Sequence, residues 1–411
     1  MKFASASKQV IPQDPFYLMG YVGPARANPA EGIHDIPEVN TMCIEIKGHQ
    51  VIYSAVDVCV FSRDKANIVK KTLSEKYGLN GDDINIIAIH SHSCPNGTTA
   101  SDRGFNEHNV NESFFNIVVK AIDETVSVCL DNLKEATAKY QITKVEGFYS
   151  NRNDKKAPYD NQAIEVHFID HANNTLGILF NIACHSTVLG PTNMLCSSDL
   201  IGTIRTKLKE RYHTNIIATM GAAGDISNRQ YRQGDDFTEL ARCSSGIFNQ
   251  ISLTNNLKQL NINDYANKIL DFVIDYDNTQ YFAKYRQLLA ETEAILADPK
   301  ITKDQFKLSA TSKKQFENKL KIDHIHREAI TNIHDFGELT IVGFGGEMSS
   351  KFGMMIKNKN PNKLTIVITC CDDDIGYFIE AEKYGKYYET IATEVPLGAP
   401  EKITEQILAS I

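Results

Sequence analysis

Residues 84–97, INIIAIHSHSCPNG, begin as a short apolar run and end in two histidines one residue apart. A β-branched run of this length predicts a strand that is buried on both faces of a sheet. Helical patterns alternate with such runs, which predicts an α/β fold whose central sheet, mixed or largely parallel, is flanked by helices. The further apolar runs are 175–185, 214–221, 338–347 and 363–374, and the helical patterns are 112–133, 197–212 and 347–357.

Two other stretches refine this architecture. Residues 43–58, CIEIKGHQVIYSAVDV, alternate on both sides of a Lys-Gly-His turn and predict a β-hairpin, followed by an amphipathic helix between Ser62 and Gly78. The charged segment 264–334 predicts a helical hairpin inserted into the α/β core, which either covers a site or pads the surface. We expect residues 1–411 to form a single α/β domain.

Composition narrows the classes of function. Hydrophobic residues make up 42% and charged residues 23% of the chain, as in an ordinary globular enzyme. The net charge of −8 argues against nucleic acid as a partner, because binding to phosphates requires a basic surface. No run reaches the ~18 apolar residues of a membrane span, and the first residues lack the apolar core of a signal peptide, so we expect a cytoplasmic protein. The sequence does not predict the oligomeric state.

The nine cysteines are an odd number and lie in apolar stretches, which favours buried thiols over a disulfide framework. Polar side chains follow each apolar run, and the carboxyl ends of strands are where α/β sheets gather ligand sites. They are His90 and His92, then His185, then Gly224 to Asn228, then Glu347, then Asp372 to Asp374 and Tyr377. Imidazoles and a carboxylate are the ligands of a catalytic zinc site with an open position.

Simpler interpretations stand beside this one. An isolated His-x-His at the end of a strand is more often a hydrogen-bonded structural pair than a metal site. Asp372 to Asp374 could bind a cation, although a solvated acidic loop is the favoured interpretation, and Asp199 is expected to interact with a helix dipole. Six other histidines lack a supporting context and are interpreted as structural, namely His108, His167, His171, His324, His326 and His334.

Six motifs in this order resemble the catalytic domain of the neutral/alkaline (non-lysosomal) ceramidases, from about residue 15 to the C-terminus. They are HSHSCPNG from His90, NR from Asn151, ACHSTVLG from Ala183, GDIS from Gly224, GGE from Gly345 and GYFIEAEKYGKYYE from Gly376. The resemblance implies one Zn²⁺ per chain; a second, structural cation stays an open alternative. The implied zinc ligands are His90, His185, Glu347 and Tyr377.

The resemblance also implies roles beside the metal. His92 would contact the substrate, and Ser227 would act either as nucleophile or as a hydrogen-bond donor to the transition state. Arg152 and Tyr388 would line the site, although a single loop arginine is more commonly a surface ion pair. The implied substrate is a small-molecule or lipid N-acyl amide, whose carbonyl the metal would polarise.

The chain departs from the family pattern at several positions. Cys94 replaces a glycine, Ser186 a proline and Asn228 a proline, which changes loop shape but none of the implied ligands. The family continues into an immunoglobulin-like domain, which we do not expect in this sequence of 411 residues. We therefore expect a zinc-dependent amidohydrolase acting on a linear amide. The alternatives are a metallohydrolase of esters or phosphoesters and a non-catalytic, ligand-binding relative.

Overall fold

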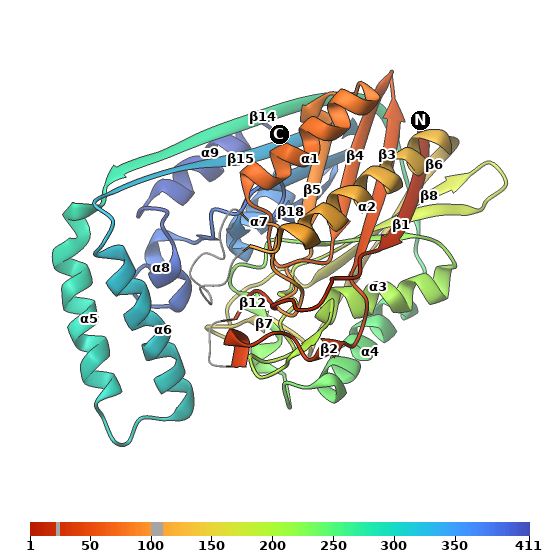
Figure 1. Cartoon of the computed structure of the whole chain (residues 1–411). Coiled ribbons are helices and arrows are strands. Elements are labelled where there is room, and N and C mark those ends of the chain that lie inside the picture. The colour runs from red at the N-terminus through yellow and green to blue at the C-terminus, as the bar shows by residue number, and fades with distance from the viewer. Residues whose placement is uncertain (22–24, 100–109) are drawn as a thin grey trace.

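The computed structural model describes residues 1–21, 25–99 and 110–411 (Figure 1). Its larger sheet has nine strands in the order β11-β9-β8-β6-β1-β3-β4-β5, with β13 beside β6. Their bounds are β1 (Lys2–Gln9), β3 (Glu38–Ile46), β4 (His49–Val56), β5 (Ile84–Ala88), β6 (Lys134–Lys144), β8 (Gln162–Asp170), β9 (Thr175–Ile182), β11 (Ile216–Met220) and β13 (Lys258–Leu260).

The larger sheet is mixed. β4 pairs in parallel with β5, and β9 pairs in parallel with β11, while β1, β3, β6 and β8 run antiparallel to their neighbours. The predicted α/β fold with a mixed sheet is confirmed. The predicted hairpin at 43–58 is also confirmed, because β3 and β4 are joined by a turn at Lys47 and Gly48, both with positive φ.

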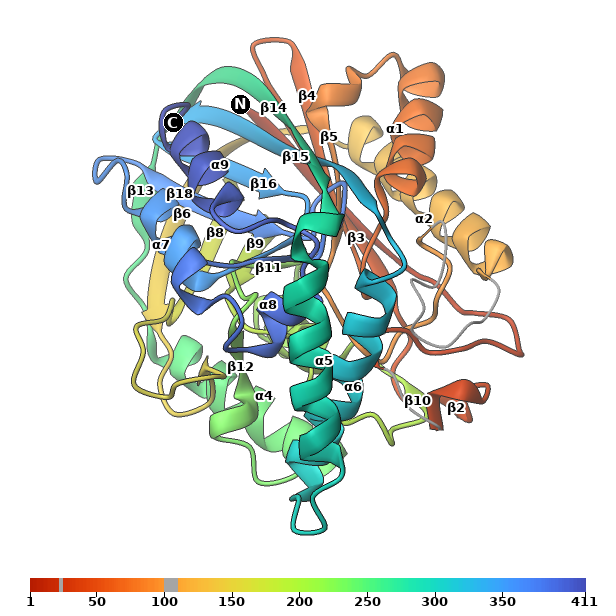
Figure 2. The ribbon, with the colours of Figure 1, turned by 90° about the vertical axis from the view of Figure 1, so that its left-hand side faces the viewer.

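A second sheet has the order β14-β15-β16-β18 (Figure 2). Its strands are β14 (Ile262–Asp277), β15 (His324–Gly337), β16 (Leu339–Phe344) and β18 (Leu364–Thr369). Ile87 of β5 bridges Cys371, and the amide of Ala88 donates to the carbonyl of Cys370 over 3.0 Å. Because β5, β11 and β18 contact one another, the edges of the two sheets meet, and the ends of the predicted strands gather there.

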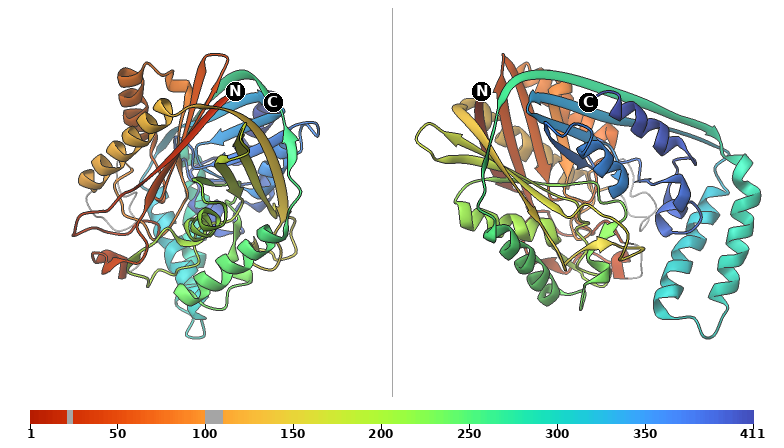
Figure 3. Two further views of the ribbon diagram at one scale, coloured as in Figure 1. Left: turned by 90° about the vertical axis from the view of Figure 1, so that its right-hand side faces the viewer. Right: turned by 180° about the vertical axis from the view of Figure 1, so that it is seen from behind.

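Helices cover the sheets on several sides (Figure 3). α2 (Glu112–Asp131) packs on β1 and β3 through a stripe at helical spacing that includes Phe114, Val118, Ile122 and Val126. The predicted helix after Ser62 is α1 (Arg63–Tyr77), which ends at Gly78 in the left-handed conformation. The others near the core are α3 (Asp199–Tyr212), α4 (Phe237–Leu253), α7 (Ser350–Lys357) and α9 (Ala399–Leu408).

The inserted segment differs in part from the prediction. Its central residues form the helical pair α5 (Phe282–Leu296) and α6 (Lys303–Lys319), which projects from the body (Figures 1 and 2). Residues 264–277 and 324–334, however, belong to the long antiparallel ribbon of β14 and β15. Charged side chains on the exposed face of this ribbon masked its alternation, in which Phe272 and Ile274 are buried while Val273 is exposed.

The position of the helical pair is relevant to the site. α6 packs against the short helix α8 (Tyr388–Ala392), and the buried Lys319 at the end of α6 donates to the carbonyl of Thr393 over 2.6 Å. The insertion is thereby fixed to the segment that carries Tyr388. No helix in the described residues is long and apolar enough to cross a membrane.

Candidate metal centre

Two histidines from neighbouring strand ends meet at the junction of the sheets. His90 follows β5 and His185 follows β9, and a parallel bridge between Ser91 and Ser186 holds the two loops together. The Nδ1–H of His90 donates to the carbonyl of Cys59 over 2.8 Å, and that of His185 donates to Ala223 over 2.7 Å. With Nδ1 used in this way, each Nε2 is left with its lone pair, the arrangement that orients histidine for a metal.

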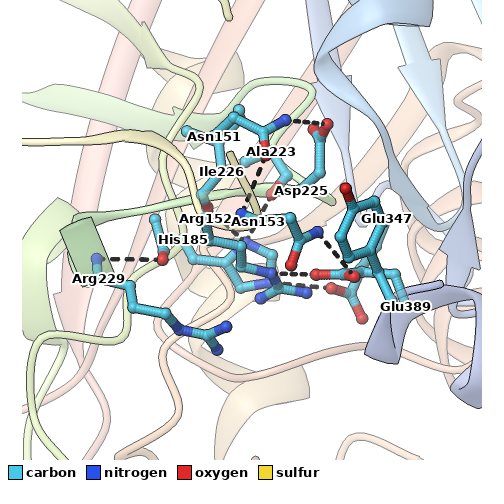
Figure 4. Close-up of polar contacts among 12 residues, drawn as sticks. Asn151, Arg152, Asn153, His185, Ala223, Asp225, Ile226, Arg229, Glu347 and Glu389 are labelled. Atoms are coloured by element: carbon cyan, nitrogen blue, oxygen red, sulfur yellow. Dashed lines mark hydrogen bonds and ion pairs between the residues drawn. The ribbon is translucent and has the colours of Figure 1, made fainter. Parts of the chain in front are cut away.

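Glu347 completes a buried three-residue cluster. Its Oε2 lies 2.9 Å from His185 Nε2 (Figure 4). The same oxygen lies 3.4 Å from His90 Nε2, and all three candidate ligand atoms lie within 4.8 Å of one another. Two atoms that each bind a tetrahedral zinc at ~2.0–2.1 Å are separated by about 3.4 Å. The side chains therefore have the type and spacing that a zinc ion requires.

The electrostatics of Glu347 and His185 point the same way, whereas at His90 the effect of burial is outweighed by Cys370 and Glu347, which raise the pKa of that imidazole. Burial opposes the ionised form of Glu347, but His90 and His185 outweigh it and hold its pKa well below the usual value. Burial, followed by the charge of Arg152, lowers the pKa of His185 to about 4 and keeps that imidazole neutral. A neutral imidazole and an ionised carboxylate are the protonation states that bind a metal.

His92 reaches the same place by a route that the sequence did not predict. β5 ends at Ala88, before either histidine, and His90 has φ = 61°. A non-glycine residue rarely adopts this left-handed conformation. The turn nevertheless brings His92 Nε2 to 3.1 Å from His90 Nε2, and Gly20 must be a glycine because a Cβ there would lie 2.5 Å from His92 Cγ.

The candidate tyrosine ligand lies beside Glu347 through backbone pairing. Strand β17 (Glu347–Met348) runs parallel to β19 (Tyr377–Phe378), with Glu347 opposite Tyr377. The rings of Tyr377 and Tyr388 pack edge to face at 6.0 Å. Burial raises the pKa of Tyr388 to about 12, so its hydroxyl stays protonated at neutral pH.

Arg152 is buried rather than part of a surface ion pair. Its Nε pairs with Glu389 Oε1, while Asn153 Nδ2 donates to Glu389 Oε2 over 3.0 Å (Figure 4). The guanidinium carbon lies 5.3 Å from the Tyr377 ring centre. Sequence reasoning missed Glu389, although it directly follows Tyr388 in the last motif.

Ser227 lies on β12 (Ile226–Ser227), which pairs with β7 (Ser150–Asn151) beside Arg152. The carbonyl of Ile226 accepts a 3.0 Å hydrogen bond from His185 Nδ1, so Ser227 is the next residue along from a group that orients the cluster. Among the described residues, the hydrogen bond to Ser227 Oγ comes from the amide of Arg229, at 3.3 Å.

A second group missed by sequence reasoning is Asp225. Its carboxylate is buried and accepts from Asn151 Nδ2 at 2.7 Å and from the amide of Ser350 at 2.8 Å, and it pairs with Lys383 Nζ at 2.9 Å. Asp225 thus joins the loops that carry Arg152, Glu347 and the tyrosines. No spacing rule could have found it, because its partners come from three separate segments.

The acidic run 372–374 is not a solvated loop, contrary to the favoured interpretation. Asp372 to Asp374 are buried, and Asp372 pairs with Lys70 Nζ at 2.8 Å and accepts from the amide of Ile86 at 2.8 Å. These contacts connect the two sheets. Asp199 accepts from the amide of Leu200 at 2.7 Å, at the start of α3, as expected.

The other histidines and cysteines lie apart from the cluster, with two exceptions. His334 and His167 are buried, and His326 pairs with Asp275 on the surface, whereas His108 lies outside the described residues.

All nine cysteines are free and buried, as predicted. Cys59 and Cys370 adjoin His90, and Cys59 could join His90 and His92 in an alternative metal group. Burial raises the pKa of the Cys59 thiol, as it raises that of Tyr377.

Comparison with known proteins identifies the family to which the chain belongs. Residues 12–227 match the sequence model of the family described as neutral/alkaline non-lysosomal ceramidase, N-terminal. The chain belongs to the neutral/alkaline ceramidase family. The family was therefore identified correctly from the six motifs.

Two curated ceramidases and two solved ceramidase structures resemble this family member. It is 25% identical over 220 residues to the neutral ceramidases of Drosophila melanogaster and Drosophila pseudoobscura pseudoobscura, matching 48% of this chain and 30% of each relative's length. The crystal structure of neutral ceramidase from Pseudomonas aeruginosa superposes with a TM-score of 0.74 at 16% identity, covering 99% of this chain and 73% of that one. A ceramidase complexed with C2 gives the same TM-score at 15% identity, covering 99% and 74%. These structural likenesses concern the fold.

Proposed function

We propose that this ceramidase-family chain is a zinc-dependent amidohydrolase that cleaves the linear amide bond of an N-acylated small molecule or lipid. The observation that carries the proposal is the convergence of His90 Nε2, His185 Nε2 and Glu347 Oε2 within 4.8 Å in a buried site. Tyr377, opposite Glu347 in the β17–β19 pair, is the proposed fourth ligand. Zinc bound there would supply Lewis-acid polarisation of the amide carbonyl.

The surrounding side chains would bind the substrate and move protons. His92 is partly buried, and desolvation, together with the neighbouring His90 and His185, lowers its pKa well below the usual value. Its neutral imidazole can accept a proton from the nucleophile that attacks the carbonyl, either water or the Ser227 hydroxyl. It can then return this proton to the departing amine. Because amide cleavage needs a proton on the leaving nitrogen, this is the role we assign to His92.

Three donors would orient the carbonyl and stabilise developing negative charge. Arg152 stays cationic, because Glu389 and then Tyr377 outweigh the effect of burial on its pKa. The hydroxyls of Ser227 and Tyr388 would be the two neutral donors. Fixed donors of this kind contribute about 3–4 kcal/mol each to transition-state stabilisation in acyl transfer.

Metal analysis combined with an amidase assay tests the proposal. Wild type, His185→Ala and the exposed control His171→Ala would be analysed for metals by plasma mass spectrometry, then assayed with a fluorogenic N-acyl amide. We expect about one zinc per chain and amide turnover in wild type and the control, with both lost in His185→Ala. Zinc without amide turnover would favour a hydrolase of esters or phosphoesters, and no metal in any sample would favour a ligand-binding relative.

A further inference from the structure

The turn after Ser227 places two arginines next to the candidate site. Residues 228–230 form a short 3-10 helix, in which the amides of Tyr231 and Arg232 both donate to the carbonyl of Asn228, over 2.8 and 2.9 Å. Gln230 Nε2 donates to the carbonyl of Arg152 over 3.0 Å, which ties the turn to the buried arginine. This is also the point where Asn228 replaces a proline of the family motif.

The guanidinium groups around this turn have unused hydrogen-bonding capacity. Arg229 and Arg232 are exposed, and within residues 1–21, 25–99 and 110–411 neither has a carboxylate or carbonyl partner for its side chain. Arg152 is 93% buried, yet its Nη2 also lacks a partner among these residues. A buried guanidinium nitrogen without an acceptor costs free energy unless a ligand supplies one.

The three arginines lie close enough to repel one another. Although Arg229 is exposed, partial desolvation of its guanidinium, and then the positive charges of Arg152 and Arg232, lower its pKa. Figure 4 shows the Arg229 side chain extending beside Arg152. In a chain with a net charge of −8, this concentration of positive charge at one site is unusual.

The neighbouring carboxylates do not neutralise the group. Glu389 pairs with Arg152 Nε, and its other oxygen is occupied by Asn153. Asp235 lines a cavity of about 280 Å³ together with Arg232, but the two side chains form no ion pair. In the part of the chain that the structure describes, neither Arg229 nor Arg232 is paired with these carboxylates.

We propose that Arg229 and Arg232 bind an anionic group on the substrate, beside the Arg152 donor assigned to the carbonyl. The inference rests on the proposed amidohydrolase function and narrows its substrate class. In an N-acyl amide the acyl chain is apolar, so the anion belongs to the amine-derived part, as a carboxylate or a phosphate. Guanidinium groups bind both through charge-assisted hydrogen bonds.

Matched pairs of substrates test the inference. N-dodecanoylglycine would be compared with the neutral N-dodecanoylglycinamide, and N-dodecanoylethanolamine phosphate with N-dodecanoylethanolamine, by product release at low ionic strength. We expect kcat/KM to favour at least one anion over its neutral partner by roughly tenfold or more, and the pair that responds identifies carboxylate or phosphate.

The variant Arg229→Gln/Arg232→Gln should reduce that preference about tenfold, whereas Arg211→Gln, an exposed arginine on α3, should retain it. Equal or faster cleavage of both neutral amides by wild type, or an unchanged preference in the double variant, would overturn the inference while leaving the amidase standing. Calorimetry measures the Kd of each of the same four compounds, so a preference for the anionic compounds can be detected even if no amide is cleaved. A preference for the anions there, without turnover, would instead remove the proposed function alone.

Discussion

His185 Nε2 lies 2.9 Å from Glu347 Oε2, although 162 positions separate the two residues in the chain. Both side chains are buried, and the Nδ1 atom of His185 is committed to backbone carbonyls. A carboxylate and a lone pair held this close, without solvent, are stabilised by a cation between them. The pair is therefore the part of the site that the proposed metal would stabilise most.

Removal of the metal should destabilise the folded protein. Because zinc binds the folded arrangement and not the dispersed ligands, free zinc at 100 times its Kd would stabilise by about 2.7 kcal/mol. We expect a chelator to lower the Tm of wild type by several degrees and added zinc to restore it. His185→Ala should show the same Tm with and without zinc. A wild-type Tm that changes with neither chelator nor zinc would contradict the assignment of a metal site.

Ser227→Ala should impair the reaction without loss of metal. The loss of one hydroxyl from the reacting centre is expected to lower kcat by roughly 10²–10³-fold, while zinc content stays at the wild-type level. Ser113→Ala, on the exposed side of α2, is the matched control and should retain full activity. A pre-steady-state burst of amine in wild type would assign Ser227 as nucleophile. An unchanged kcat in Ser227→Ala would exclude it from the reaction.

Glu389→Gln should be strongly destabilising. Glu389 is buried and pairs with Arg152, so the substitution leaves a buried guanidinium without its counter-charge, at a cost of about 3–5 kcal/mol. Urea unfolding measures the change. The control Glu382→Gln removes an exposed carboxylate paired with Lys351 and should change stability by less than about 1 kcal/mol. Similar effects for both variants would show that the buried pair contributes little.

His334 should contribute to acid sensitivity. Burial lowers its pKa to about 4, with Nδ1 held 2.5 Å from Tyr53 Oη and Nε2 3.2 Å from the carbonyl of Asp82. Between pH 6.5 and 4 the unfolded chain therefore binds a proton that the folded chain does not, and stability falls as pH falls, by about 3 kcal/mol in total.

Unfolding measured across this range tests that expectation. The free energy of unfolding of His334→Gln should decline less steeply than that of wild type between pH 6.5 and 4.5, whatever its absolute value at neutral pH. His171→Gln removes an exposed histidine and should follow the wild-type slope. Parallel curves for wild type and His334→Gln would show that His334 is not protonated on unfolding.

Much of the fold was accessible from local pattern. Apolar β-branched runs at 84–90 and 214–221 became β5 and β11, and the helix after Ser62 ended at Gly78 as predicted. The ribbon of β14 and β15 was mistaken for helix, because charged side chains on its open face hide the period of two. Which long strand pairs with which is decided by contacts between distant residues, and local propensity does not encode them.

The amino-acid sequence by itself determined the α/β class, the family and the set of side chains able to bind zinc, because residue type and motif order are properties of the chain. Only the tertiary structure decided how those side chains meet. His92 approaches His90 through a left-handed turn, Glu389 forms an ion pair with Arg152, and Asp225 connects three loops. These relationships arise where the edges of two sheets come together, so they depend on packing across the whole core and on no single segment.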